Sequence, residues 1–294
     1  MEGRDRAGAH ALLLRNPASG RAGEDLAPVQ ARFEAGGLNL VDAPEEAEAF
    51  ARAARAAALI VVAGGDGTLN RAAPRLLAAR RPFAVLPLGT ANDLARSLGV
   101  PSDPLAAAEL VFSGRLRTID LGEVNGVPFF NVASVGVSVE LARELTGETK
   151  RRFGSFSYAI AGARALLRAR RFAVTIESAK GARRARTFQV AIGNGRYYGG
   201  GMSVHHACDI GDGRLYLYSL EMRSLWRLLF MAFDFRAGVH GAWEEVRTQE
   251  GVWFTLRTRR PRAINADGEI IGRTPAHIRL LPGVLQVYAP ADPP

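Results

Sequence analysis

The chain has 294 residues, of which 48% are hydrophobic and 23% charged, and its formal net charge at pH 7 is +9. The length predicts two domains and the apolar content excludes wholesale disorder, while the single cysteine, Cys208, excludes an intrachain disulfide and a thiolate metal cluster. No apolar run approaches the roughly 20 residues that span a bilayer, and no signal-peptide core is present, so we expect a cytoplasmic protein.

The first part of the chain, up to about residue 120, alternates short apolar runs with helical segments. This alternation predicts a parallel sheet covered by helices on both faces, with ligands bound at the carboxyl ends of the strands. The expected strands are Ala11–Arg15, Leu38–Val41, Leu59–Val62 and Phe83–Leu86, and the expected helices are Glu24–Ala35, Pro44–Ala57, Thr68–Arg80 and Asn92–Leu98. The loops at 16–20, 64–68 and 87–93 then fall at one edge of the sheet.

The loop Gly64–Thr68, with the sequence Gly-Gly-Asp-Gly-Thr, is the most informative of the three. Glycine lets the backbone approach a ligand, and the N–H groups of the first helical turn point toward an anion, so this junction predicts a phosphate site. Asp66 alone would repel phosphate. Its presence is explained if it reaches the phosphate through Mg²⁺, which prefers carboxylates, water and phosphate oxygens.

The loop at 87–93, Pro-Leu-Gly-Thr-Ala-Asn-Asp, also joins a strand to a helix. Gly89 permits a tight turn, Thr90 and Asn92 offer uncharged hydrogen bonds, and Asp93 can cap the helix or orient a partner. Simple helix capping is the alternative interpretation. The presence of a second polar glycine turn in the same sheet favours a ligand site.

After about residue 119, strand-like runs separated by turn signals become frequent. They predict an antiparallel β-sandwich over residues 121–281, beside an α/β domain over residues 1–120, with helical insertions near 154–170 and 223–235. The expected strands are Val127–Val132, Phe172–Glu177, Thr187–Ile192, Arg214–Leu220, Val252–Leu256 and His277–Leu281.

Positive charge is concentrated between Arg143 and Arg186, a stretch that contains twelve basic and three acidic residues. Such a patch favours an anionic partner, either nucleic acid or an acidic membrane surface. The segment Gly154–Arg171 combines apolar side chains with arginines at both ends and could rest on anionic headgroups as a basic amphipathic helix. An ordinary packed helix with a solvated arginine face is the alternative.

Three motifs in order resemble those of the diacylglycerol kinase catalytic-domain family, which includes bacterial lipid kinases and the sphingosine and ceramide kinases. They are Asn-Pro-x-Ser-Gly at 16–20, Gly-Gly-Asp-Gly-Thr at 64–68 and Pro-x-Gly-Thr-x-Asn-Asp-x-Ala-Arg at 87–96. The resemblance continues through Phe-Asn-x-Ala-x-x-Gly at 130–136, Gly-Asn at 193–194 and three glycines at 199–201, and it ends at Asn-Ala-Asp-Gly-Glu at 265–269. Gly-Gly-Asp-Gly alone also occurs in NAD kinases and phosphofructokinases, whereas the ordered set is specific.

The resemblance implies a phosphofructokinase-like nucleotide domain beside the sandwich, with ATP in the cleft between the domains and residues 282–294 returning to the first domain. It also implies that Asp66 and Asp93 hold the catalytic Mg²⁺ through waters. The expected cofactor-binding residues are Asn16, Ser19, Gly64, Gly65, Asp66, Gly67, Thr68, Gly89, Thr90, Asn92 and Asp93.

By the same resemblance, Asp267 is the base that accepts the proton of a lipid hydroxyl, and Glu269 orients it. Phosphoryl transfer depends on positioning and charge neutralisation, and a carboxylate at an exposed turn suits the remaining proton transfer. Asp-Gly is also a common hairpin turn, so a plain turn at 267–268 is the alternative.

A second metal loop is expected at 209–214, Asp-Ile-Gly-Asp-Gly-Arg, because spaced carboxylates and glycines suit a hard cation. The resemblance implies a structural Mg²⁺ held by the Asp212 side chain and the backbone carbonyls of Asp209 and Arg214. A hairpin without metal is the alternative.

The sequence therefore predicts an ATP- and Mg²⁺-dependent lipid kinase that converts diacylglycerol to phosphatidic acid. Its expected partners are the lipid and, transiently, the anionic inner face of the membrane, and no nucleic acid. One departure from the family is Val41-Asp42-Ala43, where many relatives carry a threonine that touches the nucleotide. An NAD kinase and a non-catalytic basic module that binds anionic membrane or nucleic acid are the alternatives.

Overall fold

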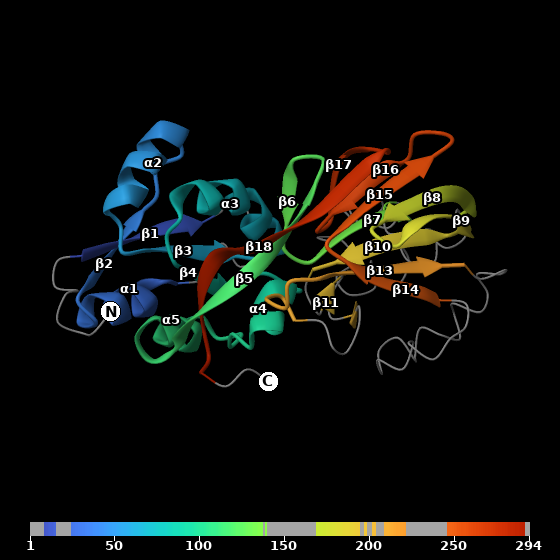
Figure 1. The fold of residues 1–294 in the computed structure, drawn as a ribbon. Coiled ribbons are helices and arrows are strands. Elements are labelled where there is room, and N and C mark those ends of the chain that lie inside the picture. Colours follow the sequence, from blue (N-terminus) through green and yellow to red (C-terminus); the bar gives the residue numbers. More distant parts are fainter. Residues whose placement is uncertain are drawn as a thin grey trace, which may run out of the picture. The chain divides into compact units, whose positions relative to one another are not determined.

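The structure is a computed structural model, and it describes residues 9–15, 25–137, 139, 169–194, 197–198, 202–203, 209–221 and 246–291. The chain divides into two compact units. Unit 1 comprises Met1–Leu121 and Pro282–Pro294, and unit 2 comprises Gly122–Leu281. Two long strands, β5 (Arg115–Val124) and β18 (Ala276–Ala289), each contribute residues to both units (Figure 1).

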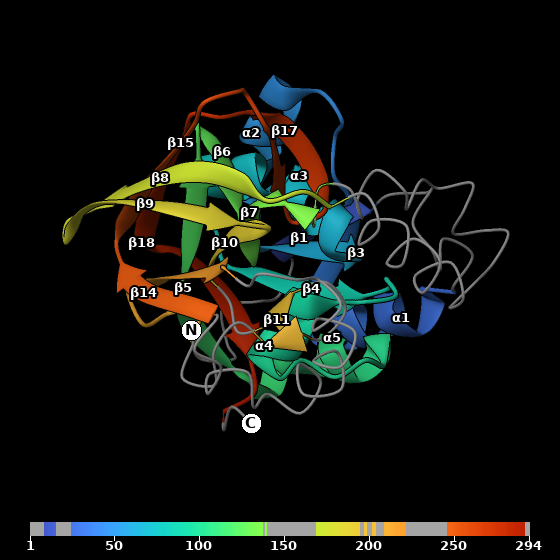
Figure 2. The ribbon, with the colours of Figure 1, turned by 90° about the vertical axis from the view of Figure 1, so that its right-hand side faces the viewer.

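Unit 1 is built on a parallel sheet. Its elements are β1 (Ala9–Arg15), α1 (Ala27–Ala35), β2 (Leu38–Asp42), α2 (Ala47–Ala56), β3 (Leu59–Gly64), α3 (Asp66–Ala79), β4 (Phe83–Pro87), α4 (Asp93–Leu98) and α5 (Pro104–Ser113). The strand order is β2-β1-β3-β4, and the last part of β18 pairs with β4. Helices α2 and α3 pack together on one face, and α1 and α5 on the other (Figures 1 and 2), so β3 is buried along its whole length. The predicted α/β architecture is confirmed.

Helix α2 begins later than the sequence predicts. It was expected from Pro44, but its first helical residue is Ala47, because Glu46 acts as the N-cap. The Glu46 carboxylate accepts the backbone N–H groups of Glu48 and Ala49 at 3.1 and 3.0 Å. These bonds satisfy N–H groups that a helix start otherwise leaves exposed.

Helix α5 is absent from the elements that the sequence predicts. Asp103 caps it by accepting a backbone N–H at 2.7 Å, and Pro104 occupies its first position. Arg32 of α1 donates through Nε and Nη2 to the Glu109 carboxylate of α5, and its Cζ lies 3.8 Å from the centroid of the Phe112 ring. This paired and stacked arginine links α1 to α5.

The described part of unit 2 contains two larger antiparallel sheets and a short two-stranded one. Its further elements are β6 (Val127–Phe129), β7 (Val132–Gly136), β8 (Phe172–Ser178), β9 (Gly181–Thr187), β10 (Gln189–Gly193), β11 (Tyr197–Tyr198), β12 (Met202–Ser203), β13 (Leu215–Leu220), β14 (Val246–Gly251), β15 (Trp253–Thr258), β16 (Ala263–Ala266) and β17 (Glu269–Arg273). One sheet has the order β18-β15-β8-β9 and the other β14-β13-β10-β7-β16-β17. Figures 1 and 2 show β8 and β9 on one side of the unit and β13 and β14 on the other.

The two larger sheets of unit 2 share one apolar core. It includes Val174 and Phe254 from the first sheet and Val190, Leu217 and Ile264 from the second. Every second residue of β8 is buried, which is the alternation expected of a sheet with one face on the core. The prediction of an antiparallel β-sandwich is confirmed.

The helical insertions expected near 154–170 and 223–235 lie outside the described residues, except for Ala169 and Arg170, which are not helical. Of the basic stretch at 143–186, the structure describes residues 169–186.

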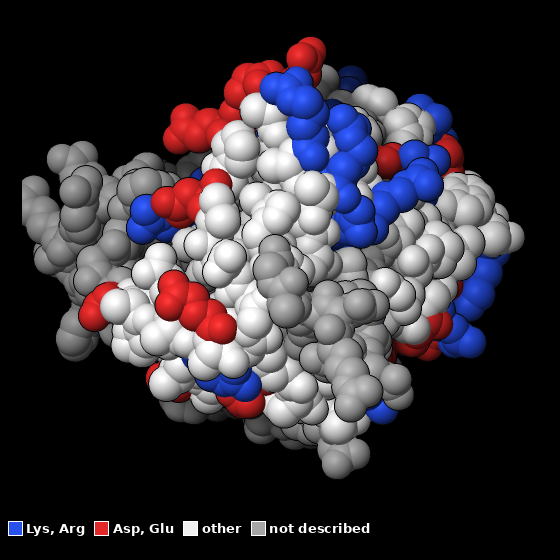
Figure 3. Space-filling view, turned by 90° about the vertical axis from the view of Figure 1, so that its left-hand side faces the viewer, with Lys and Arg blue, Asp and Glu red and all other residues white. Residues whose placement is uncertain are grey.

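None of the described helices combines the length and the apolar character that crossing a bilayer requires. On the face drawn in Figure 3, one cluster of Lys and Arg side chains stands out near the top, and smaller groups of basic and acidic side chains are scattered over the rest of the face.

Candidate active site

The first glycine turn joins β3 to α3 in unit 1. Gly64 ends the strand, Gly65 is the N-cap, and Asp66 is the first helical residue, two positions earlier than the sequence predicts. A Cβ atom on Gly64 would lie 2.4 Å from Thr68 Oγ1, so only glycine fits there. Asp66, Gly67 and the buried Thr68 form the first turn of α3. The Thr68 N–H donates to the Gly65 carbonyl at 2.9 Å, whereas the N–H groups of Asp66 and Gly67 lie at the helix end, where they have no partner within the helix.

The second glycine turn joins β4 to α4. Gly89 N–H donates to Asn92 Oδ1 at 3.0 Å, and Asn92 Nδ2 donates to the Gly89 carbonyl at 2.9 Å. Asn92 has a φ of 50°, a left-handed conformation that asparagine tolerates. It occupies the N-cap position of α4, but its side chain closes the turn instead of capping the helix. Asp93, the first helical residue, is 4% exposed, whereas Thr90 is exposed.

The two turns touch each other. A Cβ atom on Gly65 would lie 2.9 Å from Gly89 Cα, and one on Gly89 would lie 2.5 Å from Gly65 Cα. Beside this contact, Leu94 N–H donates to Asp66 Oδ1 at 3.2 Å, so the Asp66 carboxylate lies at the first turn of α4. The structure thus brings two of the three predicted loops together. The third loop lies outside the described residues, and with it the predicted residues Asn16 and Ser19.

In unit 2, Asp267 occupies the turn between β16 and β17 with a φ of 44°. Its carboxylate accepts three backbone N–H groups: Phe130 to Oδ2 at 2.7 Å, and Asn131 and Val132 to Oδ1 at 3.0 and 2.7 Å. Three hydrogen bonds of this kind fix the position of the carboxylate. The segment is a hairpin turn, as the alternative interpretation holds, and its carboxylate is also bound to a distant part of the chain. Glu269 begins β17 and is exposed.

Three buried asparagines surround this turn, and the sequence alone assigns them no role. Asn194 donates from its backbone to the Asn131 carbonyl at 2.8 Å and from Nδ2 to the Phe130 carbonyl at 2.9 Å. Asn265 Oδ1 accepts the Gly268 N–H at 3.1 Å, a local bond typical of asparagine in turns. Within the described part of the chain, Asn131 Oδ1 and Asn265 Nδ2 are buried without a hydrogen-bond partner. A polar group of a ligand would satisfy them.

The loop at 209–214 folds around Asp212. Oδ2 of this carboxylate accepts the Asp209 N–H at 3.1 Å and the Tyr216 hydroxyl at 2.6 Å, and Oδ1 accepts the Arg214 N–H at 2.9 Å. In the part of the chain that the structure describes, no group of three or more His, Cys, Asp or Glu side chains is placed to hold a metal ion. The structural Mg²⁺ loop stays a prediction.

Both units match known protein families. The family model described as the diacylglycerol kinase catalytic domain matches residues 10–124, and the one described as the YegS C-terminal NAD kinase beta sandwich-like domain matches residues 131–289. A "probable lipid kinase YegS-like" from Pseudomonas aeruginosa is 31% identical over 240 residues, covering 81% of this chain and 78% of the relative. One from Klebsiella pneumoniae is 30% identical over 238 residues, covering 80% and 79%.

Solved structures agree with these matches. A Bacillus anthracis protein described as a diacylglycerol kinase superposes with a TM-score of 0.78 at 25% identity, covering 96% of this chain and 95% of that chain. A further crystal structure with that description, from the same organism, gives 0.73 at 24% identity and covers 96% of both. The chain therefore belongs to the YegS-like lipid kinase family, whose members carry a diacylglycerol kinase catalytic domain.

Proposed function

We propose that the protein is an Mg²⁺-dependent kinase that transfers the γ-phosphate of ATP to a lipid hydroxyl, with diacylglycerol as acceptor and phosphatidic acid as product. The observation that carries the proposal is the contact of the glycine turns at Gly65 and Gly89 beside the N-terminus of α3. Backbone N–H groups at such a helix start bind phosphate. The descriptions of the matched family and of the relatives support a lipid acceptor.

In this proposal the nucleotide phosphates lie against residues 64–68 and Thr90. An added Cβ atom on Gly64, Gly65 or Gly89 would come within 2.4, 2.9 or 2.5 Å of another atom, so bare backbone lines both turns. A phosphate can approach such backbone more closely than it could approach side chains. The close packing of the two turns supports their joint use in phosphate binding.

Asp66 and Asp93 would hold the catalytic Mg²⁺ through waters. The Asp66 carboxylate lies at the N–H of Leu94, the residue that follows Asp93, and both side chains offer the oxygen donors that Mg²⁺ prefers. The residues therefore fit the ion. Mg²⁺ bound there would neutralise charge on the transferred phosphoryl group.

Asp267 would accept the proton of the attacking hydroxyl, with Glu269 orienting it. Three backbone N–H groups hold the Asp267 carboxylate in one position, which a proton acceptor requires. General-base help of this kind is typically worth 10²–10⁴-fold in rate. The buried Asn131 Oδ1 and Asn265 Nδ2 offer hydrogen bonds to a polar group bound beside the turn.

Two further parts of the proposal rest on sequence. The loop at 209–214 would bind a structural Mg²⁺ through the Asp212 side chain and the carbonyls of Asp209 and Arg214. The arginine-rich stretch at 143–186 would make transient contact with the anionic inner face of the membrane from a cytoplasmic location.

The test is phosphate transfer from labelled Mg-ATP to lipids in mixed micelles, with NAD offered in a separate reaction. Wild type should label diacylglycerol, and Asp267→Asn should not. Asparagine is the matched replacement because it tolerates the φ of 44° and its Oδ1 can accept the N–H groups that now bind Oδ1. Label in another lipid would correct the acceptor. Label in NAD alone, or none in any acceptor, would refute the proposal.

A further inference from the structure

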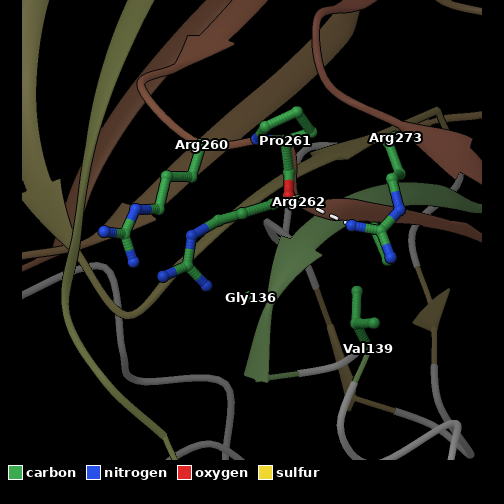
Figure 4. Close-up of a pocket in the computed structure, with 7 residues that line it drawn as sticks. Gly136, Val139, Arg260, Pro261, Arg262 and Arg273 are labelled. Carbon is green, nitrogen blue, oxygen red and sulfur yellow. Dashed lines mark hydrogen bonds between the residues drawn. The ribbon is translucent and has the colours of Figure 1, made fainter.

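Unit 2 contains a pocket of about 290 Å³ that is lined by three arginines, Arg260, Arg262 and Arg273, together with Gly136 and Val139 (Figure 4). No carboxylate is among the described residues that line it. Like charges in one hollow repel each other, and the repulsion falls when an anion enters. The charge of the pocket therefore complements an anion.

Arg262 is held in place on the wall of this pocket. Its Cζ lies 4.2 Å from the centroid of the Phe172 ring, so the guanidinium stacks on the aromatic face. Its backbone N–H donates to Thr274 Oγ1 at 3.0 Å, and its carbonyl accepts the Thr274 N–H at 2.8 Å. Stacking on an aromatic ring fixes the orientation of a guanidinium, so little entropy is lost when it binds an anion.

Arg260 lies two residues before Arg262 in the sequence. Arg273 lies on β17, where it pairs with Ala263 of β16, the residue after Arg262. Figure 4 shows Arg260 and Arg262 extending in one direction from the loop before β16, and Arg273 extending from β17 on the other side of Gly136. Arg273 Nη1 donates to the Pro261 carbonyl at 3.4 Å. Among the described residues, neither Arg260 nor Arg273 forms an ion pair.

Other arginines of the same unit are paired with carboxylates. Nitrogen–oxygen distances are 2.5 Å for Arg183 and Glu221, and 3.0 Å for Arg257 and Glu177. Three arginines line the pocket and no carboxylate is among its described lining residues, a composition that suits the bidentate recognition of a phosphate group.

The pocket lies at the end of β16 opposite Asp267. The four steps along the chain from Ala263, which lines the pocket, to Asp267 span about 13 Å at the usual rise of a strand. Under the proposed function, in which Asp267 accepts the proton of the acceptor hydroxyl, a phosphate held at the other end of β16 is distinct from the headgroup that is phosphorylated. We infer that Arg260, Arg262 and Arg273 form a separate binding site for a phosphate group, carried by an anionic phospholipid headgroup or by a soluble phosphate.

The experiment compares the full chain with Arg260→Gln/Arg273→Gln, using two probes. Calorimetric titration with inorganic phosphate tests the soluble source, and co-sedimentation with phosphatidylcholine vesicles, with and without phosphatidylglycerol, tests the headgroup. Loss of two charge-assisted contacts should weaken binding of the recognised probe by on the order of tenfold or more. The matched control, Arg115→Gln/Arg247→Gln, removes the same charge from exposed positions that lie outside both the pocket and the stretch 143–186, and it should bind like wild type.

The two probes separate the sources. Pocket-dependent binding of phosphate supports a soluble ligand, and pocket-dependent binding of phosphatidylglycerol vesicles alone supports a headgroup. Equal losses in the pocket and control variants would show that diffuse charge suffices and would overturn the inference, as would the absence of pocket-dependent binding to either probe. Arg260→Lys/Arg273→Lys provides a second test, because it keeps the charge, removes the guanidinium fork and should also weaken binding.

Discussion

Gly65 and Gly89 lie so close together that a methyl group on either would overlap the α-carbon of the other, at 2.9 and 2.5 Å. They are contributed by turns after neighbouring parallel strands, and the contact leaves no room for any side chain between those turns. Backbone alone therefore forms this part of unit 1. The position of each turn depends on the other one.

We predict that Gly89→Ala separates the turns. The added atom meets backbone and Asn92 Oδ1 at 2.6 Å, so relief requires a backbone shift costing about 1–3 kcal/mol of unfolding free energy. A displacement of the phosphate-binding backbone should lower kcat/KM for ATP by on the order of 10²-fold. Chemical denaturation and steady-state kinetics measure the two effects.

Gly67→Ala is the matched control for stability. An added Cβ atom at Gly67 meets nothing within 4 Å, and the residue lies in the first turn of α3, where alanine is favoured over glycine by up to about 1 kcal/mol. Its unfolding free energy should equal or exceed that of wild type. Equal stability of Gly89→Ala and Gly67→Ala would show that the turns do not constrain each other.

Asp66→Asn should separate a structural role of this residue from a role in Mg²⁺ binding. The amide oxygen can still accept the Leu94 N–H that Asp66 Oδ1 accepts at 3.2 Å, so the fold should persist. Loss of a carboxylate that binds Mg²⁺ through water should raise the Mg²⁺ concentration for half-maximal activity about 10–100-fold. The control is Glu177→Gln in unit 2, whose carboxylate pairs with Arg257. An unchanged Mg²⁺ requirement in Asp66→Asn would refute the assignment.

The glycine turns could be predicted from sequence for two reasons. Conformational freedom is a property of glycine itself, and the apolar run that precedes each turn is adjacent to it in the sequence. The contact between Gly65 and Gly89 could not, since it depends on how closely β3 and β4 pack. The start of α3 at Asp66 was missed for a related reason. Gly67 indicates a loop by composition, yet an N-terminal helical turn tolerates glycine at modest cost.

Strand β18 shows the same limit. The sequence predicts that it ends at Leu281, and the next two residues, Pro282 and Gly283, are of types that usually interrupt strands. The strand continues to Ala289, and Gly283, with a φ of 59°, donates its N–H to Asp120 Oδ1 at 2.7 Å. The two residues are 163 positions apart, so no local pattern contains this contact. Long-range partners of this kind decide whether a breaker ends a strand.

Asn194→Ala should impair catalysis by way of the Asp267 turn. Its side chain is 1% exposed and donates to the Phe130 carbonyl, next to the N–H groups that hold the Asp267 carboxylate. Removing the donor leaves a buried carbonyl with one hydrogen bond fewer and should cost about 1–3 kcal/mol of unfolding free energy. Because the carboxylate is then less well fixed, kcat should fall while KM for ATP stays unchanged.

The control for this variant is Ser219→Ala. Ser219 is also buried, at 0% exposure, but its Oγ has no hydrogen-bond partner among the described residues. Its removal should leave the stability unchanged or raise it, since a buried polar atom without a partner is lost. If kcat of Asn194→Ala equals that of wild type and of Ser219→Ala, Asn194 does not position the turn.

The pairing of Arg32 with Glu109 predicts a pH-dependent contribution to stability. The hydrogen bond from Arg32, opposed by desolvation and aided by the charge of Arg32, lowers the pKa of the Glu109 carboxyl below its ordinary 4.5. A carboxyl whose pKa is lowered by folding stabilises the protein fully above its unfolded pKa, and this contribution is lost as the pH falls through the folded pKa. Glu109→Gln should therefore lower the Tm at pH 7, and the difference from wild type should shrink as the pH falls below about 4.5.

Thermal unfolding of both proteins from pH 7 down to strongly acidic buffer measures this difference. Added salt should reduce it, because the pair is partly exposed and screened by counterions. Glu48→Gln is the control, since the Glu48 carboxylate lies 3.8 Å from Arg52 with 85% of its side chain exposed. We expect the Tm difference between this variant and wild type not to shrink as the pH falls. A Tm difference for Glu109→Gln that stayed constant through the acidic range would mean that the link between α1 and α5 depends on the stacking of Arg32 on Phe112 and not on the charge of Glu109.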